Sequence, residues 1–114
     1  MKNESNDYKI VYVTTSSIDS ASHISKILVN ENLAACCTVL PNAISYFQWD
    51  NSINERHECL IMIKTTNARL QFLMNRVKEL HHDEVPEIIA VEIQDGFKPY
   101  LDWISDTLPS SFNN

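Results

Sequence analysis

The sequence of 114 residues has a single glycine, no long apolar run and no excess of positive charge. One glycine leaves no room for a glycine-rich loop that cradles phosphates. No apolar run approaches the ~20 residues that span a bilayer, and the polar N-terminus MKNESNDYK lacks the apolar segment of a secretory signal. We therefore expect a cytoplasmic protein that does not contact a membrane.

The charge balance argues against nucleic acid as a partner. Acidic residues outnumber basic ones, giving a formal net charge of -6 at pH 7, and the Lys and Arg residues are scattered along the chain. A phosphate backbone attracts clustered positive charge, which this chain does not have. The length fits about one domain. We expect residues 1–114 to form a single domain, with an ordered core at about 8–108 between polar N- and C-terminal tails.

Three cysteines are an odd number, which favours reduced thiols over a disulfide framework. Cys36 and Cys37 are adjacent in a segment with strand character, so their side chains point to opposite faces and cannot jointly hold one ion. No CxxC pair is present. We expect all three, Cys59 included, to act as small buried apolar residues.

Runs of β-branched, aromatic and apolar residues predict four strands, and apolar residues at helical spacing predict three helices. The strands are expected at 8–14, 33–49, 58–66 and 87–93, and the helices at 18–32, 67–80 and 100–104. Asp50, Asn51 and Ser52 supply a turn between the second and third strands, and Pro41 indicates an edge strand or a bulge. The order βαββαβ with a terminal helix predicts an α+β, ferredoxin-like sandwich, in which a four-stranded antiparallel sheet carries both main helices on one face.

The predicted hairpin at 33–66 is too long for two helices to cover, because strands of ordinary length have about 5–6 residues. Tyr46, Phe47 and Trp49 lie together near its tip and would form an exposed aromatic patch on a monomer. The far end of the hairpin therefore needs a protein partner.

Two histidines and three carboxylates crowd the segment from Glu79 to Ile89. Pro86 disfavours helical geometry at Val85, so the second helix must end before it. The first interpretation is a helix exit and strand entry in which Asp83 and Glu84 stay solvated. The second is a weak, exchangeable metal site on His81 and His82.

An acid/base pair of Glu84 and Glu87 is the third interpretation of that segment. No nucleophile or set of oxyanion donors accompanies the pair, so we expect a protein that is not an enzyme. The remaining histidines, His23 and His57 with its neighbour Glu58, have the pattern of ordinary surface or interface residues.

The chain resembles the CutA divalent-cation-tolerance family from about Lys9 to Ile104. The motifs that carry the resemblance occur in order along the chain: Leu33-Ala-Ala-Cys36, Ser45 with Trp49, Glu58 leading to Ile63-Lys-Thr-Thr66, His81, Val85-Pro-Glu-Ile-Ile89, and Gly96 followed by Tyr100-Leu-x-Trp103. Together, and at these spacings, they are far more specific than any one of them alone.

The resemblance implies a homotrimer of ferredoxin-like subunits packed through their long hairpins, similar in architecture to the nitrogen-regulatory PII signalling proteins. It also implies a binding or signalling role in the response to metal ions, with Cu(II) or another divalent cation as an exchangeable ligand that folding does not require. A PII-like small-molecule sensor and a trimeric scaffold that anchors another protein remain alternatives.

Motif-matched polar residues mark a candidate ligand cleft between subunits, lined by Thr14, Lys64, Glu87 and Tyr100. Lys64 would suit an anionic or carboxylate ligand. The alternative is that Lys64 and Glu87 satisfy each other across the trimer.

The chain departs from the family's pattern near the metal-binding motif. The family usually has His-Pro-Tyr before the Val-Pro-Glu run, whereas His82 and Asp83 follow His81 here. Members with a copper assignment use a cysteine in the first strand and two consecutive histidines. Val13 stands at the cysteine position and Leu80 at the first histidine position, so only His81 is retained, with His82 as a neighbouring substitute. Two further departures are Phe47 in place of the usual tyrosine and Asn51 in place of the glycine after the tryptophan.

Overall fold

Strands and helices follow one another in the predicted order in the computed structural model, which describes residues 7–109. The elements are β1 (Tyr8–Thr15), α1 (Ile18–Asn30), β2 (Cys36–Trp49), β3 (Ser52–Thr66), the 3₁₀ turn η2 (Asn67–Arg69), α2 (Leu70–Leu80), β4 (Ile88–Glu92) and α3 (Lys98–Thr107). Most of each predicted polar tail lies outside the described residues. Among residues 7–109, no helix is both long and apolar enough to cross a membrane.

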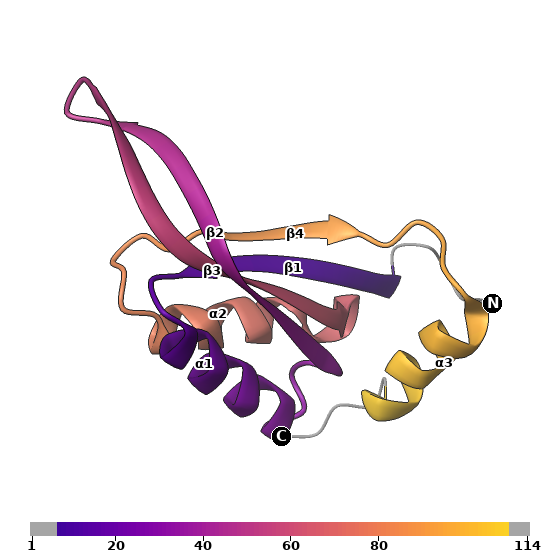
Figure 1. Cartoon of the computed structure of the whole chain (residues 1–114). Coiled ribbons are helices and arrows are strands. Elements are labelled where there is room, and N and C mark those ends of the chain that lie inside the picture. The colour runs from indigo at the N-terminus through magenta and orange to yellow at the C-terminus, as the bar shows by residue number, and fades with distance from the viewer. Residues whose placement is uncertain (1–6, 110–114) are drawn as a thin grey trace.

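The four strands form one antiparallel sheet in the order β2-β3-β1-β4. Helices α1 and α2 lie side by side on one face of this sheet, and α3 lies at the end where β1 begins (Figure 1). This arrangement confirms the ferredoxin-like α+β fold with both main helices on one face.

The main core lies between the sheet and the two helices. Alternate residues of the central strands point toward α1 and α2, as the period of a strand requires. They pack on the apolar stripes of the helices, and the fully buried members of this core include Val11, Val13, Ile24, Leu28, Ile61, Ile63, Leu73 and Val77. A second, smaller core under α3 contains Tyr8, Ala35, Ile104 and Leu108.

Asparagine takes the place of glycine where α1 ends. Asn32 has φ 60°, a left-handed conformation that asparagine tolerates better than most residues. This conformation lets the Asn32 N–H donate to Val29 O at 3.1 Å and the Leu33 N–H donate to Leu28 O at 2.9 Å. Both bonds satisfy carbonyls that the helix end would otherwise leave without a partner.

The hairpin between β2 and β3 closes with a two-residue turn. Asp50 and Asn51 have φ 54° and 63°, the positive values that a type I′ turn requires at both central positions. The pairing register shifts between Leu40 and Ala43, and Asn42 within this bulge has φ 67°. The bulge at Pro41 is therefore confirmed, and so is the turn at Asp50 and Asn51, whereas Ser52 already belongs to β3, which begins six residues before the predicted strand.

Strand β3 is longer than β1, so the hairpin continues as a two-stranded arm (residues 43–49 and 52–58). The last residue pair between β1 and β3 is Thr15 with Cys59, and residues 52–58 pair only with β2. Figure 1 shows this arm projecting beyond the rest of the sheet. Its exposed apolar residues are Ile44, Tyr46, Phe47, Trp49 and Ile53.

Two details of the helices differ from the sequence prediction. Helical spacing places Arg69 on the polar side of the second helix, but Arg69 is only 3% exposed, and its Nη1 donates to Pro109 O at 2.8 Å. The helix begins with the 3₁₀ turn η2, which turns Arg69 inward, and burial lowers the pKa of its guanidinium. The terminal helix, predicted at 100–104, is longer: α3 begins at Lys98 and extends to Thr107.

An ion pair joins the end of α1 to α2. The Arg76 guanidinium donates from Nε to Glu31 Oε1 and from Nη2 to Glu31 Oε2, both at 2.9 Å. These hydrogen bonds hold the pKa of Glu31 below its ordinary value. The pair therefore stabilises the fold above the pKa that Glu31 has in the unfolded chain, and this stabilisation is lost as the pH falls through the lowered folded value.

We predict that Glu31→Gln lowers the denaturation midpoint at neutral pH and that its difference from the parent shrinks in acid. At low pH the parent's Glu31 is protonated, so the two proteins lose the same contact. Urea denaturation at a series of pH values measures this, with Glu84→Gln as the control. A difference that stays constant from neutral to acidic pH contradicts the prediction.

Candidate functional site

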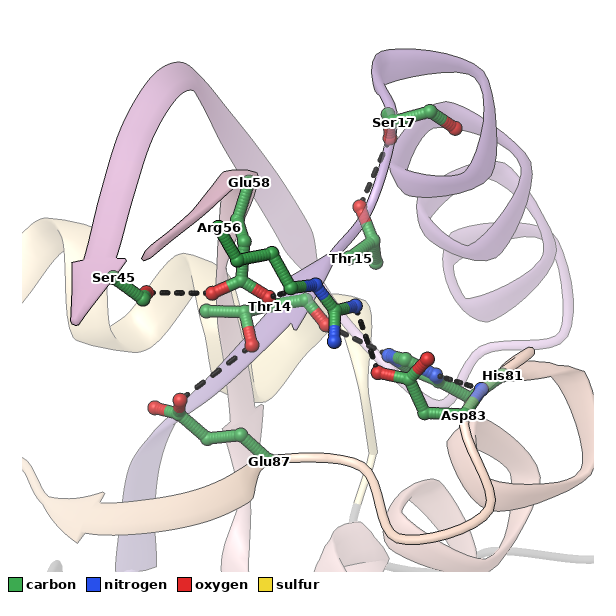
Figure 2. A network of polar contacts seen from close by, with 9 residues as sticks. All are labelled: Thr14, Thr15, Ser17, Ser45, Arg56, Glu58, His81, Asp83 and Glu87. Carbon is green, nitrogen blue, oxygen red and sulfur yellow. Dashed lines mark hydrogen bonds and ion pairs between the residues drawn. The ribbon is translucent and has the colours of Figure 1, made fainter. Parts of the chain in front are cut away.

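The segment that follows α2 leaves the helix where the sequence predicts. The last helical residue is Leu80, and His81 is extended, with φ -80° and ψ 141°. The following residues cross to β4, which begins at Ile88. We call residues 81–87 the α2–β4 loop, and Figure 2 shows it beside the end of β1.

His81 faces the backbone of β1. Its Nε2 lies 2.7 Å from Thr14 O, and its Nδ1 lies 3.0 Å from the backbone nitrogen of Asp83. The neighbouring His82 is exposed instead. Within residues 7–109, no group of three or more His, Cys, Asp or Glu side chains is arranged to hold a metal ion. The two predicted metal ligands, His81 and His82, therefore differ in their surroundings: His81 contacts backbone groups and His82 is exposed.

A buried carboxylate lies at the base of the arm. Glu58 is 8% exposed, and its two oxygens are used by different neighbours. Ser45 Oγ donates to Glu58 Oε1 at 2.6 Å, and Arg56 Nε lies 3.2 Å from Glu58 Oε2. The expectation that Glu58 is an ordinary surface or interface residue is therefore wrong, because its ion pair and hydrogen bond compensate for its burial.

Arg56 also connects the arm to the α2–β4 loop. Its Nη2 donates to Asp83 Oδ2 at 2.9 Å, so one guanidinium bridges two carboxylates (Figure 2). Asp83 was expected to stay solvated, but it is partly buried and held by this contact. Sequence spacing gave no signal for the bridge, because Arg56 and Asp83 are distant in the chain and meet only when the loop folds back over β1.

The four predicted cleft residues form two separate groups in one chain. Thr14 Oγ1 donates to Glu87 Oε1 at 3.5 Å. Lys64 Nζ donates to Thr38 Oγ1 at 2.9 Å, and Lys64 is the register partner of Ile10 in β1. Thr14 lies four residues from Ile10, which is roughly 13 Å along a strand. Both groups lie on the sheet face that α1 and α2 leave open, since Val11 and Val13 point to the helices.

Tyr100 belongs to the Lys64 group. Burial raises the pKa of Tyr100, and the nearby Cys36 thiol adds to that rise. Cys36 is the register partner of Lys64 on β2, which brings the thiol, the ammonium and the phenol to one end of the open face. The ring of Tyr100 stacks on Trp103, with centroids 5.6 Å apart.

The cysteines are free thiols, as predicted. Cys59 is buried, and burial raises the pKa of Cys37 to about 11. Cys36 and Cys37 are only partly buried, which corrects the expectation that all three cysteines are buried.

A hollow of about 660 Å³ lies away from this network, beside α3. None of the four predicted cleft residues lines it; its lining includes Asp7, Thr66, Asn67, Ser105 and Asp106. Its position therefore gives no support to the predicted cleft.

The chain is similar to proteins of divalent-ion tolerance over most of its length. Residues 9–107 match the family of CutA1 divalent ion tolerance proteins. The "Divalent-cation tolerance protein CutA" of Thermus thermophilus is 40% identical over 86% of this chain and 95% of its own. "Protein CutA" of Mus musculus is 34% identical over 90% of this chain, which spans 58% of the mouse protein. The crystal structure of CutA from Xylella fastidiosa matches with a TM-score of 0.87 and 36% identity, covering 90% of this chain and 98% of that one.

We predict that Ser45→Ala destabilises the protein by about 1–3 kcal/mol, because it removes a donor from a buried carboxylate. Chemical denaturation measures the loss. Ser52→Ala is the matched control, since Ser52 Oγ makes only an exposed contact with Trp49 O. Equal stability of the two variants would show that the Ser45 bond to Glu58 contributes nothing.

Proposed function

The chain belongs to the CutA1 divalent ion tolerance family, and from that premise we propose that it is a homotrimer that binds ligands and catalyses no reaction. The observation that carries the trimer is the arm. A two-stranded ribbon is marginally stable alone, yet this one exposes 66% of Tyr46 and 67% of Trp49. Arms of three subunits that pack on one another would bury these rings and cover the open strand edges.

The two groups of cleft residues support a ligand site between subunits. The Thr14 and Glu87 pair and the Lys64 and Tyr100 group lie at opposite ends of the open face. In a closed ring of subunits, each contact joins two different patches of the chain, so the two ends of this face can meet across one contact. We propose that a cleft forms there, with Lys64 as the cation for a carboxylate or another anionic ligand.

The binding role, in place of catalysis, is supported by how the polar network is used. The charged side chains of this network already contact one another or a hydroxyl of the same chain. Glu58 accepts from Ser45 and pairs with Arg56, and Asp83 of the α2–β4 loop pairs with Arg56 as well. These contacts lie within the fold and favour a structural role for this network.

A weak, exchangeable divalent cation completes the proposal. His82 fits this role, because it is exposed, and Glu84, two residues away, is exposed as well. Imidazole is a good ligand for Cu(II) and Zn(II). His81 fits it less well, because groups of the backbone lie within 3.0 Å of both ring nitrogens. The main core lies under the sheet, away from His82, so removing the cation would leave the fold intact.

We predict that the parent protein is a trimer at micromolar concentration, with three times the 13.1 kDa mass of the chain. The double variant Tyr46→Ser with Trp49→Ser should shift to lower mass, because it removes the largest apolar side chains of the arm. Light scattering coupled to size exclusion measures both, with Val29→Ser on α1 as the control. A monomeric parent contradicts the trimer.

We predict weak binding of Cu(II) and Zn(II) in calorimetric titration of the metal-free protein. The affinity should fall as the pH is lowered, because protons compete with the metal for imidazole. His82→Ala should weaken binding, whereas His23→Ala, at an exposed residue of α1, should not. Unchanged binding by the His82 variant would place the cation elsewhere, and no binding by the parent would remove the metal from the proposal.

A further inference from the structure

The hydrogen bonds of His81 determine its tautomer. Nε2 lies 2.7 Å from Thr14 O, and a carbonyl oxygen only accepts, so Nε2 carries a proton. Nδ1 lies 3.0 Å from the backbone nitrogen of Asp83, whose N–H only donates, so Nδ1 presents its lone pair. A single neutral tautomer satisfies both contacts, and it leaves no nitrogen lone pair for a metal ion.

We infer that His81 is a structural clamp between β1 and the α2–β4 loop and is not a ligand of the exchangeable cation. The part that concerns the cation rests on the proposed function above, whereas the tautomer follows from the contacts alone. This inference differs from what the family resemblance implies, since His81 is the one histidine retained from the copper-binding pattern.

The clamp is one of three attachments that hold the loop. The first is the hydrogen bond between the His81 ring and Thr14 O, and the second is the ion pair of Asp83 with Arg56. The third is the hydrogen bond from the Thr14 hydroxyl to Glu87 (Figure 2). The first two are directly coupled, because the N–H of Asp83 bonds to the His81 ring while its carboxylate bonds to Arg56.

A metal ion at His81 would have to displace one of these bonds. Coordination at Nδ1 would break the bond from the Asp83 N–H, and coordination at Nε2 would remove the proton donated to Thr14 O. Either change leaves a backbone group without its partner, which costs free energy unless water replaces it. The exposed ring of His82 carries no such cost, so a cation would bind there first.

Histidine-selective ¹H–¹⁵N NMR of the ¹⁵N-labelled protein tests the clamp directly. The expected spectrum of the metal-free protein shows His81 protonated at Nε2 and unprotonated at Nδ1. On addition of Zn(II), the ring signals of His82 should move while those of His81 stay in place. A His81 protonated at Nδ1, or His81 signals that move with Zn(II), would overturn the inference. If Zn(II) moves no histidine, the proposed metal binding fails, while the tautomer of His81 still decides the clamp.

Denaturation of four variants gives a second readout. His81→Asn keeps an acceptor near the position of Nδ1, and His81→Gln keeps a donor near the position of Nε2, so each should lose part of the clamp. His81→Ala loses both bonds and should show a larger drop in the denaturation midpoint than either. His82→Ala is the control and should match the parent. Parent-like stability of His81→Ala would overturn the clamp.

Discussion

The unequal lengths of β1 and β3 are the constraint on which the rest of the structure depends. β3 has 15 residues and β1 has 8, so the sheet narrows to two strands beyond Cys59. At that point the sheet that α1 and α2 cover continues as a two-stranded ribbon. Glu58 is the first residue past the end of β1, and the β2 bulge ends at its register partner Ala43. The polar network therefore lies where the architecture changes.

The chain has a single glycine, so other residues take the positions where the described backbone has a positive φ. All four non-glycine residues with positive φ in the described part of the chain are Asn or Asp: Asn32, Asn42, Asp50 and Asn51. Their short polar side chains tolerate the left-handed region better than most residues do. Because these positions end α1, form the bulge and close the hairpin, the direction of the arm depends on asparagine and aspartate.

Local patterns were sufficient to predict the fold but not the polar network. Runs of β-branched and apolar residues identified the strands, although β3 begins at Ser52, six residues before the predicted start. The period of 3.6 residues identified the two main helices, and Pro86 correctly indicated that α2 ends before it. The burial of Glu58, Asp83 and Arg69 did not follow from these patterns, because each depends on a partner distant in sequence. Spacing along one strand does not give the register with the next, so the contact between Ser45 and Glu58 could not be foreseen. The grouping of Lys64 with Cys36 required the same register.

The α2–β4 loop and the arm are not independent parts of the molecule. The N–H of Asp83 donates to His81 Nδ1, the carboxylate of Asp83 accepts from Arg56, and Arg56 also pairs with Glu58. Two ion pairs of Arg56, with Asp83 and with Glu58, therefore join the loop after α2 to the base of the arm. If the arm forms the contact between subunits, the loop that carries His82 is mechanically linked to the assembly surface.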